Sequence, residues 1–128
     1  MSAENGTGAD LRSSWRDLMA AHARISDALD HALQRRHGLS LTEFEVLQRL
    51  AESPDGHQRM QELAVEIHLS PSALSRLVGR LERTGLVERD ICETDRRGIY
   101  ACLTDAGRRV QDAAEPTHRE VLAATLAG

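Results

Sequence analysis

Apolar residues between positions 60 and 104 follow two different periods, which predict two short helices and then two strands. The apolar face of the first helix is formed by residues at i, i+3, i+4 and i+7, namely Met60, Leu63, Ala64 and Ile67. The second helix begins at Pro71, where no N–H is needed, and Ser70 precedes it as a suitable N-cap. His68 lies in the turn between them, where glycine is more usual, but histidine tolerates positive φ better than most residues.

The second helix has two chemically different faces. Its apolar face carries Leu74, Leu77 and Leu81. The opposite face is polar and cationic, with Ser72, Ser75, Arg76, Arg80 and Arg83. A helix-turn-helix needs a small residue where its helices cross and apolar residues that hold the second helix, and Ala64, Leu74 and Leu77 meet those needs.

Two stretches of strand-forming residues flank a charged segment that closes at Gly98. The strand-forming residues are Leu86, Val87, Ile91, Ile99, Tyr100 and Leu103. They predict a β-hairpin, or wing, with Asp95, Arg96 and Arg97 near its tip, where a guanidinium can reach a minor groove.

The register of this hairpin decides whether the two cysteines can meet. If Val87 faces Leu103, Cys102 lies opposite Glu88 and Cys92 lies opposite Gly98. The two thiols are then not cross-strand partners, and a disulfide between them is not expected.

Towards the N-terminus, apolar residues recur at alternating intervals of four and three, which is heptad spacing. The residues on this seam are Leu11, Trp15, Leu18, His22, Ile25, Leu29 and Ala32. They predict a helix over residues 10–38, after a polar tail over residues 1–9 that is expected to be disordered. One helix cannot bury such a stripe alone, so it must pack on another element or on a second chain.

Two further helices are predicted, one before residue 60 and one after residue 104. Thr42 and Glu45 have the spacing of a capping box for a helix that runs to about Glu52, with Phe44, Leu47 and Leu50 inward. Residues 53–56 form a turn. The last helix follows Thr104, with Val110, Ala113 and Ala114 inward, and Pro116 predicts a kink or a restart. Its apolar face continues with His118, Val121, Leu122 and Leu126.

The amino-acid composition favours some classes of function over others. One Trp, one Tyr and one Phe leave little aromatic surface for stacking unpaired bases, which favours duplex DNA over single strands or RNA. The net charge is −4, but positions 68–84 hold three arginines and one glutamate, a local balance of +2. The chain has no lysine, nucleophile–base pair or phosphate-binding glycine loop, so an enzyme is not expected.

Membrane proteins, secreted proteins and metal-binding proteins are also disfavoured. No apolar run is long enough for a membrane span, and the polar start lacks a signal-peptide core, so a cytoplasmic protein with reduced cysteines is expected. No cofactor is expected. His22, His31, His37 and His118 lack close ligand spacing, and no metal site is predicted.

Three segments, SPSALSRLVGRLERTGL, GLVERD and DRRGIYACLTDAG, together resemble the MarR family of bacterial transcriptional regulators over roughly residues 40–110. The resemblance implies a mainly α fold with a small β-hairpin wing. It divides the chain into a tail (1–9), an N-terminal dimerisation helix (10–38), a winged helix-turn-helix lobe (39–104) and a C-terminal dimerisation helix (105–128). Gly79 and Ala101 depart from the family pattern, which has a polar or acidic residue and a β-branched residue there.

The resemblance also implies roles for individual residues. Base edges would be contacted by Ser72, Ala73, Ser75 and Arg76, and phosphates by Arg80 and Arg83. Arg97 would enter the minor groove and Asp95 would orient neighbouring arginines. The whole set expected at DNA is Ser70, Ser72, Ala73, Ser75, Arg76, Arg80, Arg83, Asp95, Arg96 and Arg97.

A homodimer and a small-molecule effector are implied in the same way. Dimer contacts are expected from Leu11, Leu18, Ile25, Val121 and Leu122. An effector pocket is expected to be lined by Trp15, Met19, His22 and Phe44, unless these four are core residues. The resulting hypothesis is a ligand-responsive repressor that binds a pseudo-palindromic operator as a homodimer. Two alternatives stay open: a thiol-based redox sensor that uses Cys92 or Cys102, and a winged helix that binds only protein.

Overall fold

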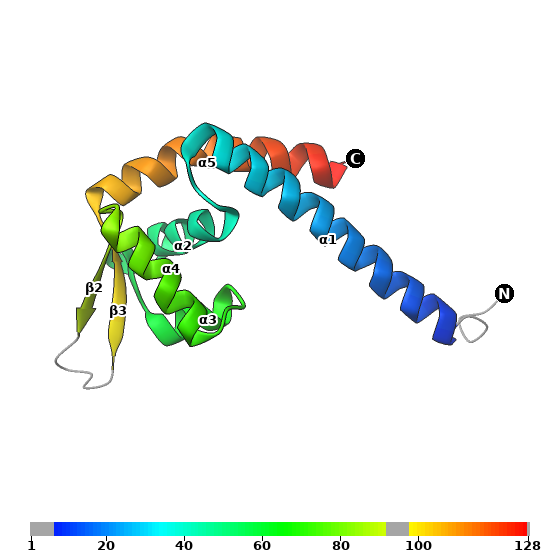
Figure 1. Ribbon diagram of the computed structural model, residues 1–128, viewed down its shortest axis with the longest axis horizontal. Helices are drawn as coiled ribbons and strands as arrows, with labels where there is room; N and C mark the ends of the chain where they lie inside the picture. The colour runs from blue at the N-terminus through cyan, green and yellow to red at the C-terminus, as the bar shows by residue number, and fades with distance from the viewer. Residues whose placement is uncertain (1–6, 92–97, 128) are drawn as a thin grey trace.

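The computed structural model describes residues 7–91 and 98–127. Along these residues the elements follow in the order α1 (Thr7–His37), α2 (Leu41–Glu52), the 3₁₀ turn η2 (Pro54–Gly56), β1 (His57–Arg59), α3 (Met60–Glu66), α4 (Pro71–Arg83), β2 (Val87–Ile91), β3 (Ile99–Leu103) and α5 (Asp105–Ala127). Helices α2, α3 and α4 and the strands form one lobe, from which α1 extends as a long arm (Figure 1). The predicted fold class, mainly α with a small β wing in a winged helix-turn-helix, is confirmed. The two terminal helices, predicted as dimerisation helices, pack against each other within the chain.

The wing is a three-stranded antiparallel sheet rather than a simple hairpin. Strand β3 lies in the centre, between β1 and β2. Val87 pairs with Leu103 and Glu88 pairs with Cys102, which is the predicted register. The additional strand β1 pairs His57 with Cys102 and Arg59 with Tyr100. Strand β1 has no signal in the local sequence, because its three residues are polar and take their strand geometry from the partner strand.

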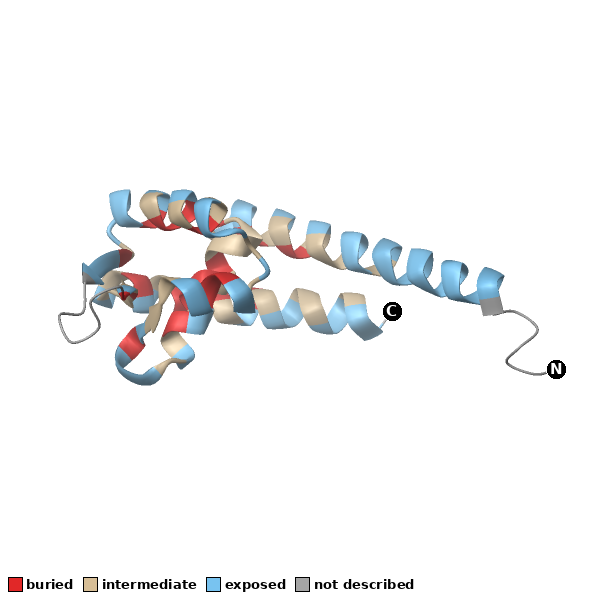
Figure 2. Cartoon of the chain, turned by 90° about the horizontal axis from the view of Figure 1, so that it is seen from below, coloured by how far each residue is buried: buried red, intermediate tan, exposed pale blue. Residues whose placement is uncertain are grey.

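The hydrophobic core lies inside the lobe, where Figure 2 shows most of the buried residues. Phe44, Leu47 and Leu50 of α2 are fully buried, as predicted from their spacing. The predicted apolar faces of α3 and α4 also point into this core. No helix in the described part of the chain combines the length and the hydrophobicity that a bilayer crossing requires.

The arm formed by α1 changes character along its length. Helix α1 packs against α5, and Leu29 and Leu33 are buried. In contrast, every residue from 8 to 20 is exposed, as the pale half of the helix in Figure 2 shows. The helix also begins at Thr7, so residues 7–9 belong to it and not to a disordered tail.

Two details of helices α2 and α5 differ from the predictions. The capping box of α2 is formed by Ser40 and Glu43, not by Thr42 and Glu45. Helix α5 runs unbroken through Pro116, so no restart occurs there. Its buried residues lie on both sides of the proline and include Gln111, Ala114 and Thr117. This packing against α1 and α2 holds the helix together, whereas Ala113, predicted inward, is exposed.

Two helical glycines in the described chain give a matched test of how closely the first turn of α5 packs against Leu86. A Cβ atom on Gly107 would lie 2.1 Å from the backbone oxygen of Leu86, whereas one on Gly79 would be no closer than 3.5 Å to any neighbour. Gly107→Ala should therefore lower the free energy of unfolding by more than about 2 kcal/mol. Gly79→Ala should raise it by about 0.5–1 kcal/mol, because alanine is the better helix former. Urea unfolding of the two variants measures both effects, and similar shifts in the two would contradict the close approach of Gly107 to the Leu86 backbone.

Candidate nucleic-acid interface

The turn between α3 and α4 sets the direction of α4. His68 has a φ of 60°, so it occupies the left-handed conformation predicted for it. Leu69 N–H donates to the carbonyl of Ala64 at 2.9 Å and closes the turn. Helix α4 then begins with Pro71 at its N-terminus, and the Oγ of Ser70 accepts from the N–H of Ala73 at 3.1 Å. The local sequence thus fixes where α4 starts and how it leaves α3.

The two faces of α4 are separated as predicted. Leu74, Leu77 and Leu81 are buried, and Val78 joins them. The expected DNA-contact residues on the other face are exposed at Ser70, Ser72, Arg76, Arg80 and Arg83, and half-buried at Ala73 and Ser75. Seven of the ten residues in that set therefore lie along one accessible side of one helix. The remaining three, Asp95, Arg96 and Arg97, lie outside the described residues, as does Cys92.

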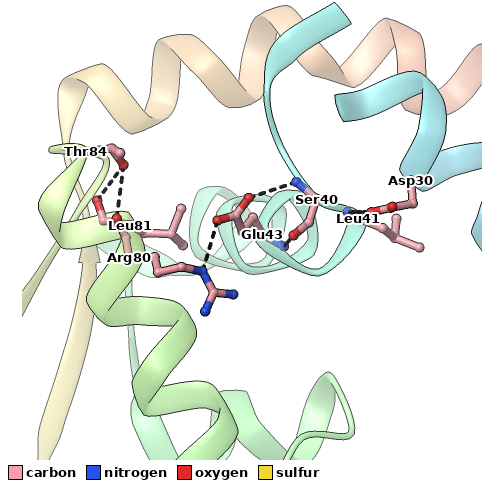
Figure 3. A network of polar contacts seen from close by, with 7 residues as sticks. All are labelled: Asp30, Ser40, Leu41, Glu43, Arg80, Leu81 and Thr84. Atoms are coloured by element: carbon pink, nitrogen blue, oxygen red, sulfur yellow. Dashed lines mark hydrogen bonds and ion pairs between the residues drawn. The ribbon is translucent and has the colours of Figure 1, made fainter. Parts of the chain in front are cut away.

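Arg80 is linked to the start of α2, as Figure 3 shows. Its Nε atom lies 3.7 Å from Glu43 Oε2. Glu43 also accepts from the N–H of Ser40 at 2.8 Å, and Asp30 of α1 accepts from the N–H of Leu41 at 2.8 Å. A continuous line of polar contacts therefore runs from α1 through the N-terminus of α2 to a cationic residue on α4.

Arg89, on β2, contacts α4 but is absent from the predicted set. Its guanidinium donates to the carbonyl oxygen of Ser75 at 2.5 Å and to Ser75 Oγ at 3.1 Å. Its Nε atom is 2.9 Å from Glu82 Oε1. The alternation of side chains along β2 could have predicted this contact. Arg89 lies on the same face of the strand as the buried Val87, whereas Glu88 and Asp90 lie on the opposite face.

The residues proposed from sequence to line an effector pocket do not all come together. Trp15, Met19 and His22, together with Leu18, line a groove of about 520 Å³ on α1. Trp15 is 61% exposed and therefore not a core residue. Phe44 is fully buried in the lobe and its ring stacks on His118 at 4.7 Å. Phe44 is thus part of the core and not of this groove, because the α2 period turns it inward.

The residues expected at a dimer interface divide into two groups. Leu11 and Leu18 are 66% and 63% exposed on the free half of α1. Ile25, Val121 and Leu122 are half-buried near the region where α1 and α5 pack together. His37 and Thr117 tie these two helices through a 2.7 Å hydrogen bond. Within the described residues, no three potential metal ligands cluster.

Comparisons with known proteins agree with this architecture. Residues 37–98 match the MarR family. The HTH-type transcriptional regulator YkoM of Bacillus subtilis is 31% identical over 101 residues, which cover 77% of this chain and 64% of YkoM. The chain thus spans slightly less than two thirds of that relative.

Two solved structures resemble this fold over most of the chain. Sco3205, a MarR family transcriptional regulator from Streptomyces coelicolor crystallised with DNA, is 38% identical with a TM-score of 0.85, and the match covers 91% of this chain and 73% of that one. CouR from Rhodococcus jostii RHA1, crystallised with p-coumaroyl-CoA, is 26% identical with a TM-score of 0.74, over 83% of this chain and 72% of CouR. The chain belongs to the MarR family of helix-turn-helix transcriptional regulators, which is not a family of enzymes.

Proposed function

We propose that this chain represses transcription by binding a pseudo-palindromic duplex as a homodimer, with α4 in the major groove. The observation that carries this proposal is the cationic outer face of α4, on which Arg76, Arg80 and Arg83 are all exposed beside the sheet. A helix of this width fits the major groove of B-DNA, and arginine is the side chain best suited to guanine edges and phosphates. Occupied promoter DNA would be closed to polymerase.

The wing is proposed to make a second contact with the DNA. Strand β2 packs against α4, and residues 92–97 follow β2 in the chain. Arg97 is therefore proposed to reach the minor groove next to the major groove that α4 occupies. Asp95 and Arg96 are proposed to support it. The crystallisation of Sco3205 with DNA supports DNA binding by a chain of the same fold.

The exposed half of α1 is proposed to meet the same helix of a second chain. Leu11, Trp15 and Leu18 expose more than 60% of their surface on the heptad seam, and a self-complementary twofold contact would cover them. Two recognition helices would then enter successive major grooves, with half-sites about one helical turn apart.

A small-molecule effector is proposed to bind beside this dimer contact. The groove along Trp15, Met19 and His22 is open in a single chain, and a second chain would close it. CouR was crystallised with an aromatic acyl-CoA, so p-coumaroyl-CoA is a suitable first compound to test. An effector that binds one spacing of the two lobes more tightly would shift the dimer away from DNA.

DNA binding can be tested through its salt dependence. Wild-type protein should select a duplex from a randomised 30-bp library, and Arg83→Gln should reduce the salt slope of log Kd by about one unit through the loss of one phosphate contact. Arg119→Gln is the matched control, because Arg119 is an exposed arginine on α5. If no duplex is selected, the alternative of a protein-binding winged helix is favoured. An unchanged slope in Arg83→Gln would remove Arg83 from the interface.

The dimer can be tested by placing a charge on the seam. Leu18→Asp should convert the protein to a monomer in sedimentation equilibrium, because an unpaired carboxylate would be buried in the contact. Val65→Asp serves as the control, since Val65 is 75% exposed on α3, away from the seam. A dimer that survives Leu18→Asp would show that the interface lies elsewhere.

The redox alternative depends on thiol reactivity, which the surroundings of Cys102 oppose. Burial raises the pKa of the free Cys102 thiol, and the carboxylates of Asp90 and Glu88 raise it further. A raised pKa leaves less thiolate at a given pH, so alkylation by iodoacetamide at pH 8 should be slower than that of free cysteine.

The cause of this low reactivity can be separated from simple shielding. In a Cys92→Ser background, Asp90→Asn should speed alkylation of Cys102, because removing the carboxylate lowers the thiol pKa. Asp112→Asn, on an exposed position of α5, should have no effect. Alkylation as fast as that of free cysteine in the parent protein would instead favour a redox role.

A further inference from the structure

Arg89 lies across the surface of α4 over a line of three residues spaced by four and three. Its contacts are with Ser75 at one end of this line and Glu82 at the other, at 2.5–3.1 Å. The residue between them is Gly79. A single side chain of β2 therefore holds almost two turns of the helix that faces DNA in the proposed function.

Gly79 has no backbone reason to be glycine. It lies in the interior of α4, where glycine is unfavourable, and its φ is helical. A Cβ atom there would lie 3.5 Å from Arg89 Nη2 and 3.7 Å from Arg83 Nη1, which is ordinary contact. Alanine would therefore fit, whereas a longer side chain would occupy the space that the Arg89 guanidinium fills.

We propose that Arg89 is a positioning residue for DNA recognition and that the absence of a long side chain at Gly79 leaves the space that the Arg89 guanidinium occupies. This inference rests on the proposed DNA-binding function. Arg89 fixes the wing against α4, and by donating to Ser75 Oγ it leaves the Ser75 hydroxyl hydrogen free to donate elsewhere. The hydroxyl on the base-reading side of the helix thus acquires one preferred direction.

The same contacts argue against a role for Arg89 as a phosphate ligand. Its charge is paired with Glu82 at 2.9 Å, and its side chain is 32% exposed, compared with 53% for Arg80. An arginine that already has a carboxylate and a backbone carbonyl as partners gains little from exchanging them for a phosphate. Arg89 should therefore govern specificity rather than the salt-dependent part of the affinity.

The test compares two duplexes in each variant: the one that wild-type protein selects from a randomised library, and an unselected duplex of the same length. Arg89→Lys keeps the charge but cannot span Ser75 and Glu82 together. It should lower the ratio of specific to non-specific affinity about tenfold, as for the loss of one base contact, with the salt slope unchanged. Gly79→Leu should cause a similar loss by displacing the guanidinium, and Gly79→Ala should stay within about twofold of wild type.

A double variant tests directly whether Arg89 and Gly79 act through the same contact. Arg89→Lys with Gly79→Leu should lose no more than either change alone, because both remove the same contact. Thermal unfolding without DNA should show the same non-additivity, which keeps the inference testable if wild-type protein selects no duplex and the proposed function fails. Circular dichroism confirms that each variant is folded.

Three results would overturn the inference. One is an unchanged specificity ratio in Arg89→Lys. Another is a salt slope that falls by one unit in Arg89→Gln, which would make Arg89 a phosphate ligand. The third is a loss in Gly79→Ala as large as that in Gly79→Leu, which would show that the DNA backbone, and not Arg89, needs the space at Gly79.

Discussion

The packing of the apolar face of α4 into the lobe is the constraint from which the rest of the interface follows. Leu74, Leu77, Val78 and Leu81 are almost fully buried, and each contributes about 1.5–3 kcal/mol by leaving water. The exposed ion pairs of the lobe contribute at most about 1 kcal/mol each. Burial therefore fixes the rotation of α4, and the serines and arginines are left outside because the leucines must be inside.

Two sets of polar contacts then refine what burial has fixed. On one side, Arg89 ties α4 to β2 and hence to the wing. On the other, Arg80 meets Glu43 at the N-terminus of α2, where Asp30 of α1 also binds the backbone (Figure 3). A shift of the α1 arm thus has a short physical route to a cationic residue of α4, which is the kind of connection that a proposed effector at the arm would need.

The arm itself is built from two halves with different partners. Its C-terminal half packs on α5 within the chain, and His37 donates to or accepts from Thr117 there. Its N-terminal half exposes Leu11, Trp15 and Leu18, and apolar side chains exposed together on one face are typical of an interaction site. The single heptad seam of the sequence therefore serves an internal contact at one end and, in the proposed dimer, an external contact at the other.

The sequence alone determined the helix-turn-helix, the hairpin register and the inward residues of α2 and α4, because these depend on local periodicity, turn conformation and capping. Tertiary structure decided the features that have no local signal. Strand β1 exists because β3 offers a free edge, and α5 continues through Pro116 because both flanks are packed. Tertiary structure also decided between two pairs that both have capping-box spacing in the sequence, Ser40–Glu43 and Thr42–Glu45, in favour of the first. It also placed Arg89 over Gly79, since a contact between a strand and a helix depends on their relative position, which periodicity within either element does not specify.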